Sequence, residues 1–191
     1  MMDETICRKV SVPWRHMPRM AEYSDPVQVN SACLICDRIP ISRGRSAREW
    51  FDDGYEAHLR GEEARAMRLY RYALEVDGAF VPARYNLGCL LTRQGNLADA
   101  EVRFSEVVET DPLHYKSHLM LGNIKVEQQQ LLAAEEHLER CVDIAPDYAD
   151  AYRSLAEVYD GLGCRRLAMQ MRRRYQVLVG AVSSGLIQAA Q

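Results

Sequence analysis

No run of apolar residues in the 191-residue chain approaches the roughly 20 residues needed to span a bilayer. The N-terminal stretch MMDETICRKVSVPWRHMPRM also lacks the apolar core of a secretory signal. We therefore expect a cytoplasmic chain without a membrane span. The formal net charge is -3 and acidic and basic residues are interspersed, so no strongly basic face indicates a nucleic-acid partner.

Motifs that carry catalytic chemistry are also missing. The sequence has no phosphate-binding glycine loop, no HExxH and no GxSxG. Its five histidines are spread along the chain, and they form no nucleophile–base or metal-ligand pattern. We predict that the protein is not an enzyme, has no catalytic residues, takes no small-molecule substrate and needs no cofactor.

The six cysteines are scattered, and in a chain without a secretory signal we expect free thiols. Cys33 and Cys36 have the spacing of half a zinc site, which Cys7 and His16 could complete. One such pair is weak evidence, because the other candidate ligands are distant and irregularly placed. A metal or redox protein that uses Cys33 and Cys36 is kept as a lesser alternative, and no metal site is predicted.

The positive feature of the sequence is an internal repeat with a period of 34 residues. A column of small residues holds Gly54, Gly88, Gly122 and Ala156, and a column of alanines holds Ala66, Ala100, Ala134 and Ala168. A column of large side chains holds Tyr70, Phe104 and Leu138, and Arg172 takes this position in the fourth copy. A column of turn glycines holds Gly61, Gly95 and Gly163, with Gln129 as the exception in the third copy. Several columns that share one period predict stacked repeats.

Each copy contains two amphipathic segments joined by a short link, which predicts a pair of antiparallel helices. The first helices are expected at 47–60, 81–94, 116–128 and 149–161, and the second at 63–76, 97–109, 131–144 and 165–178. A glycine inside a helix costs about 1 kcal/mol relative to alanine. We interpret Gly88 as a point of close approach between the two helices, with Ala100 as its small partner and Phe104 beside them.

These columns resemble the tetratricopeptide repeat (TPR), with its pattern Trp-x2-Leu-Gly-x2-Tyr, then Ala-x3-Phe, then Pro. Trp50 and Gly54 match the opening, and Gly78, Pro112, Pro146 and Gly180 are taken to close the copies. The resemblance implies an all-α, right-handed α-solenoid of about four helix-turn-helix repeats, at 47–80, 81–114, 115–148 and 149–182. Residues 1–46 lack the period and are expected to form an irregular, flexible arm, and 183–191 a tail or cap.

In the family that the chain resembles, the first helices line a concave groove that receives a peptide or a partner helix. The resemblance thus implies a non-enzymatic scaffold or adaptor with a protein or peptide partner. The groove columns hold Phe51, Tyr55, His58, Tyr85, Cys89, Arg93, Lys116, Asn123, Arg153 and Glu157. Their charges predict apolar and acidic ligand groups near the first repeats and basic groups near the last. The residues that clamp chaperone tails match only at Asn86 and Lys116, so that ligand is not predicted.

One local excess of charge lies in the last copy, at Arg165, Arg166, Arg172, Arg173 and Arg174. We interpret it as a solvated terminal face that keeps the end of the array soluble. The alternative is a regulatory or nucleic-acid-associated repeat protein that uses this cluster. An uncovered apolar end would favour self-association, so a homo-oligomer remains open.

Overall fold

The structure, a computed structural model, describes residues 44–183. That range contains eight α-helices and no strand, which confirms the all-α prediction. The helices are α1 (Ala47–Leu59), α2 (Glu63–Val76), α3 (Val81–Arg93), α4 (Leu97–Thr110), α5 (Tyr115–Glu127), α6 (Leu131–Ile144), α7 (Ala149–Gly161) and α8 (Arg165–Ser183). None of these described helices is long and apolar enough to cross a membrane. Cys33 and Cys36, nearly all of the predicted arm and most of the predicted tail lie outside the described residues.

The prediction for the end of the fourth copy was wrong. Gly180 lies inside α8, which continues to Ser183, and so it does not close the copy. The predicted turn column behaves as expected, because Gly61, Gly95 and Gly163 have φ angles of 77°, 76° and 74°. Gln129 adopts the same left-handed conformation with a φ of 60°, although this region favours glycine. The turn geometry is therefore common to all four copies.

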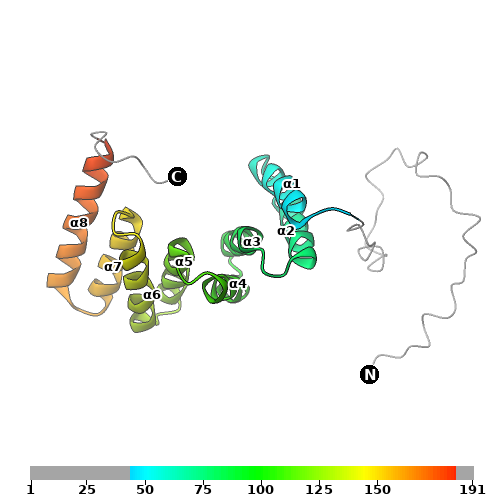
Figure 1. Cartoon of the computed structure of the whole chain (residues 1–191). Coiled ribbons are helices and arrows are strands. Elements are labelled where there is room, and N and C mark those ends of the chain that lie inside the picture. The colour runs from blue at the N-terminus through cyan, green and yellow to red at the C-terminus, as the bar shows by residue number, and fades with distance from the viewer. Residues whose placement is uncertain (1–43, 184–191) are drawn as a thin grey trace, which may run out of the picture. The chain divides into compact units, whose positions relative to one another are not determined.

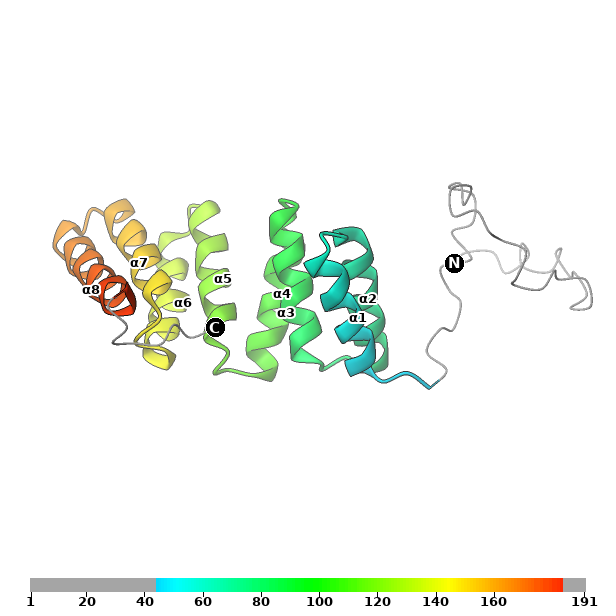
Figure 2. The same cartoon turned by 90° about the horizontal axis from the view of Figure 1, so that it is seen from above.

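Successive helix pairs stack in chain order, as both views show (Figures 1 and 2). Each first helix packs against its own second helix and against the second helix of the preceding pair. The buried residues form two clusters that meet at α5: Leu121 and Ile124 belong to the first cluster, and Leu119 belongs to the second. The result is an α-solenoid in which each pair buries its apolar stripe against its neighbours.

The small column lets a large side chain lie directly on the backbone of the first helix. A Cβ atom added at Gly88 would lie 2.8 Å from the Phe104 ring, and one at Gly122 would lie 2.5 Å from Leu138. Phe104 and Leu138 are fully buried, so neither side chain has free space to move into. The residue that needs the glycine is thus Phe104 rather than Ala100.

The fourth copy differs from the other three in both of these columns. Ala156 stands in the glycine column, and the residue opposite it is Arg172 instead of a large apolar side chain. Arg172 is exposed and forms an ion pair with Asp160, so it does not press on α7 as Phe104 presses on α3. A Cβ atom is therefore tolerated at position 156, and the two columns change together.

A further column fastens the first helices α3, α5 and α7 to the link that precedes each of them. The Arg84 guanidinium donates to the Gly78 carbonyl, His118 Nε2 donates to the Pro112 carbonyl at 3.3 Å, and the Tyr152 hydroxyl donates to the Pro146 carbonyl at 2.9 Å. The acceptor is six residues earlier in each case, so three different side chains perform one structural task. Trp50 holds this column in α1, where the guanidinium of Arg45 lies 4.1 Å from the ring centroid.

The His118 and His137 rings meet where α5 packs on α6, with their Nδ1 atoms 3.4 Å apart. Because His118 Nε2 donates to the Pro112 carbonyl, a neutral His118 accepts at Nδ1 and His137 donates. Burial lowers the pKa of both rings, and the proximity of His118 lowers the pKa of His137 further. The charged neighbours of this pair are Arg140 and Glu136 on α6 and the bonded Lys125 and Glu101.

We predict that Gly88→Ala lowers the free energy of unfolding by about 1–3 kcal/mol, because the new Cβ atom overpacks against Phe104. Gly180→Ala is the matched control, since a Cβ atom there meets nothing within 4 Å and alanine is the better helix former. Urea denaturation of both variants measures the difference. Equal stability of Gly88→Ala and wild type would contradict the packing argument.

We predict that stability falls as the pH drops below about 6.5, the ordinary pKa of histidine. The folded-state pKa of His118 and His137 is lowered, so the unfolded chain takes up protons first. The contribution of these two rings to stability is therefore fully present at a pH above their pKa in the unfolded chain. It is lost as the pH falls toward their lower pKa in the folded protein. His137→Gln should give a flatter profile of melting temperature against pH than wild type, and an unchanged slope would exclude the pair as its source.

Candidate functional site

The residues predicted for the groove lie on the first helices and fall into two groups. Phe51 and Tyr85 occupy one column and pack between repeats. The Phe51 ring lies 5.6 Å from Phe80, and the Tyr85 ring lies 5.0 Å from His114 and 5.7 Å from Phe104, measured between ring centroids. Both are half-buried, so most of each ring stabilises the stack and only part of it is available to a partner.

The second group, in the column four residues later, is exposed at its two ends and half-buried between them. Tyr55 is 48% exposed, Cys89 and Asn123 are half-buried, and Glu157 is exposed. Because one residue comes from each of α1, α3, α5 and α7, this column follows the array from end to end. It changes from an aromatic ring to a carboxylate, as the sequence predicts. We call this surface, with Lys116, the first-helix face.

Lys116 is the cation at the centre of the first-helix face. Its Nζ lies 5.9 Å from the centroid of the Tyr115 ring, and Tyr115 packs edge-on against Tyr148 at 5.0 Å. The charge of Lys116 reaches Cys89 on α3, where it opposes the rise in the thiol pKa. No ion pair within residues 44–183 involves Lys116. A half-buried cation among aromatic rings is suited to a carboxylate from outside the chain.

Sequence reasoning missed Tyr115, Tyr148 and His114. The signal was available, because the residue before the first helix of copies two to four is aromatic or histidine: Phe80, His114 and Tyr148. His114 packs on Tyr85, and Phe80 packs on Phe51. The link residue of one copy thus packs against the groove column of the copy before it.

The thiols of Cys89 and Cys141 are not activated as nucleophiles. Burial raises the pKa of Cys89, and burial also raises the pKa of Tyr85. Burial raises the pKa of Cys141 to about 12. Nucleophilic cysteines need the opposite shift, toward the thiolate. The arrangement therefore favours packing over catalysis at both cysteines.

The other residues considered for the groove differ in the ion pairs and hydrogen bonds that they form within the fold. Arg93 pairs with Glu63 of α2 at 2.6 Å, and Arg153 pairs with Asp150 at 3.3 Å on its own helix. His58 is half-buried, and its Nδ1 has no hydrogen-bond partner among the described residues. Asn86 donates to the Tyr70 hydroxyl at 3.4 Å, so its amide is committed to the core.

The α8 arginines are partly neutralised by α7 and the residues before it. Arg172 pairs with Asp160, and Arg174 lies 3.4 Å from Asp147. Arg165, Arg166 and Arg173 are exposed, and none of them forms an ion pair with another described residue.

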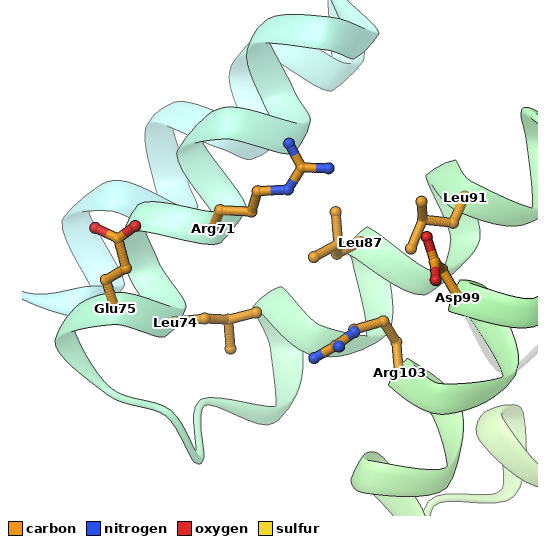
Figure 3. A pocket seen from close by; sticks show the side chains of 7 residues that line it. All are labelled: Arg71, Leu74, Glu75, Leu87, Leu91, Asp99 and Arg103. Atoms are coloured by element: carbon orange, nitrogen blue, oxygen red, sulfur yellow. The ribbon is translucent and has the colours of Figure 1, made fainter. Parts of the chain in front are cut away.

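A hollow of about 440 Å³ lies away from the predicted groove, where α2 approaches α3 and α4 (Figure 3). Leucines form its floor and charged side chains form its rim. The lining residues are Arg71, Leu74, Glu75, Leu87, Leu91, Asp99 and Arg103. Figure 3 shows Arg71 extending from α2 toward the space above Leu87. The hollow shows which columns of a second helix face the next first helix.

The stacked pairs define an α-solenoid repeat protein. The sequence model of the tetratricopeptide repeat family matches residues 85–149, so this segment carries tetratricopeptide repeats. The solved structures agree on the fold. A MamA crystal structure is 24% identical with a TM-score of 0.65, covering 71% of this chain and 74% of that one. The first TPR domain of RPAP3, bound to the HSP90 peptide SRMEEVD, is 19% identical with a TM-score of 0.59, covering 62% of this chain and 94% of that one.

Among curated proteins, the chain is similar to the peroxisomal targeting signal receptor of Kluyveromyces lactis. The two are 26% identical over 130 residues, which is 66% of this chain and 22% of the receptor. The corresponding receptor of Saccharomyces cerevisiae is 31% identical over 103 residues, which is 52% of this chain and 17% of that receptor. The chain thus spans about a fifth of the length of these relatives.

We predict that alkylating reagents modify Cys164 faster than Cys89 or Cys141 in the folded protein, because it is the exposed thiol among these three described cysteines. A pKa near 12 leaves Cys141 about a thousandfold less thiolate than an ordinary cysteine, and Cys89 is also shifted upward. Iodoacetamide labelling followed by peptide mass spectrometry gives the three rates. Labelling of Cys141 as fast as Cys164 would contradict its burial.

Proposed function

We propose that the protein is a non-enzymatic scaffold or adaptor that binds a peptide or partner helix along the first-helix face. The observation that carries this proposal is Lys116, a half-buried cation that has no ion pair among residues 44–183 and is adjacent to the Tyr115–Tyr148 aromatic pair. Such a group gains little inside the fold. It gains a charge-assisted hydrogen bond when a partner supplies a carboxylate.

The change from an aromatic to an acidic residue along the first-helix face supports a ligand that binds in one orientation. Tyr55 at the α1 end offers exposed aromatic surface, and Glu157 at the α7 end offers a carboxylate. The ligand we propose has apolar and acidic groups near the first repeats and basic groups near the last. Peptide binding by the RPAP3 domain supports the same mode of recognition in this fold. A chaperone-tail clamp is not proposed, because Asn86 is engaged with Tyr70.

We predict that the purified full-length chain selects peptides with an acidic residue next to an apolar one from a peptide array. Lys116→Glu should weaken the selected peptides by about tenfold or more in Kd, because it replaces attraction with like-charge repulsion. Tyr55→Ala should weaken them through lost aromatic contact. Fluorescence polarisation with labelled peptides measures each Kd.

Leu132→Ala is the matched control, since Leu132 is 73% exposed and lies on the second helix α6. Its Kd should equal that of wild type. Selected peptides without acidic enrichment, or an unchanged Kd for Lys116→Glu, would exclude the first-helix face as the site.

A further inference from the structure

The internal junctions of the array show how a second helix receives the next first helix. At the hollow between α2 and α3, residues Arg71 and Leu74 face Leu87 and Leu91 (Figure 3). The next two junctions are joined by polar contacts that start from the Leu91 column. Lys125 bonds Glu101 on α4 at 2.6 Å, and Tyr159 bonds Glu139 on α6 at 3.1 Å.

The same columns can be read at the two ends of the array. Moving three periods of 34 residues from Arg71, Leu74 and Glu75 leads to Arg173, Gln176 and Val177 on α8. No further described helix packs on α8 there, and Val177 is 60% exposed. Met169, in the Met67 column, is 53% exposed. We call this surface the α8 end face.

The opposite end has the complementary charge. Moving one period back from Leu87 and Leu91 leads to Asp53 and Ala57 on α1. Ala57 is buried, so the exposed residues here are the carboxylates Asp53 and Glu56. No described helix precedes α1. We call this surface the α1 end face. Glu56 pairs with Arg60, and Asp53 pairs with Arg45 at 2.6 Å while 49% of the Asp53 side chain stays exposed.

The α8 end face has no such compensation. The sequence of α8, RRLAMQMRRRYQVLVGAVS, contains no acidic residue, and Arg173 has no ion-pair partner among the described residues. In the register of the internal junctions, Arg173 meets the position of Asp53. The pairing at this point is therefore ionic.

We propose that the α8 end face of one chain receives the α1 end face of a second copy, in the register that α2 uses for α3. Arg173 then pairs with Asp53 of the neighbouring copy, whose exposed carboxylate leaves room for a second guanidinium beside Arg45. A head-to-tail contact of this kind does not close on itself unless its rotation forms a ring. The stack continues the first-helix face from one copy to the next, but the proposal does not depend on what that face binds.

Sedimentation velocity of the full-length chain over a wide concentration series tests the proposal. Wild type should form species larger than a dimer as concentration rises, and added salt should weaken them through screening. Arg173→Glu and Asp53→Arg should each weaken association by about tenfold or more, because each places like charges at the junction.

The decisive sample is an equimolar mixture of the two variants. Glu at 173 of one variant can pair with Arg at 53 of the other, and Arg173 of the second with Asp53 of the first, so mixing should restore association. Arg68→Glu on the exposed side of α2 is the matched charge-reversal control and should behave as wild type. Circular dichroism verifies that every variant is helical.

Two results would overturn the proposal. A wild-type chain that stays monomeric at every concentration excludes the junction. A mixture that associates no better than its separate components excludes the head-to-tail register, even if wild type self-associates through another surface.

Discussion

The contact between a large buried side chain and a glycine backbone fixes the geometry on which the array depends. The Phe104 ring lies where a Gly88 side chain would be, and Leu138 does the same over Gly122. This contact sets how closely the two helices of a copy approach, and therefore where each pair presents its outer residues to the next pair. The loss of helix propensity at one glycine is small beside the burial of a whole aromatic ring.

A period of 34 residues imposes this geometry on every copy while leaving the chemistry of other columns free. The column of Arg84, His118 and Tyr152 shows the separation clearly, because three unrelated side chains donate to the carbonyl six residues earlier. The residue type at this column can vary because the fold requires only a hydrogen-bond donor there. The columns of Lys116 and Tyr55 are freer still, because the fold asks nothing specific of them, and these are the columns that can be selected for a partner.

Much of the fold was predictable from the sequence, because columns such as Gly54, Gly88 and Gly122 report packing that is repeated in each copy. Predictions from single residues were less secure. Gly180 was predicted to close the fourth copy, yet α8 continues through it to Ser183. The His118–His137 contact and the packing of His114 on Tyr85 depend on rotamers and on contacts between columns, which a period in one column does not encode.

The sequence predicts which repeat columns lie on the first-helix face. It does not predict which of their side chains are available to a partner. The residues of this face divide into rings that pack between repeats, such as Phe51 and Tyr85, and side chains such as the exposed Tyr55 and the half-buried cation Lys116. Only the three-dimensional contacts separate these groups, because both contain aromatic residues at the same spacing. The two ends of the array also depend on the repeat.

In a repeat array each internal contact surface recurs at the two ends, where Arg173 corresponds to Arg71 and Asp53 takes the position of Leu87. The ends are thus where departures from the repeat carry the most information about partners.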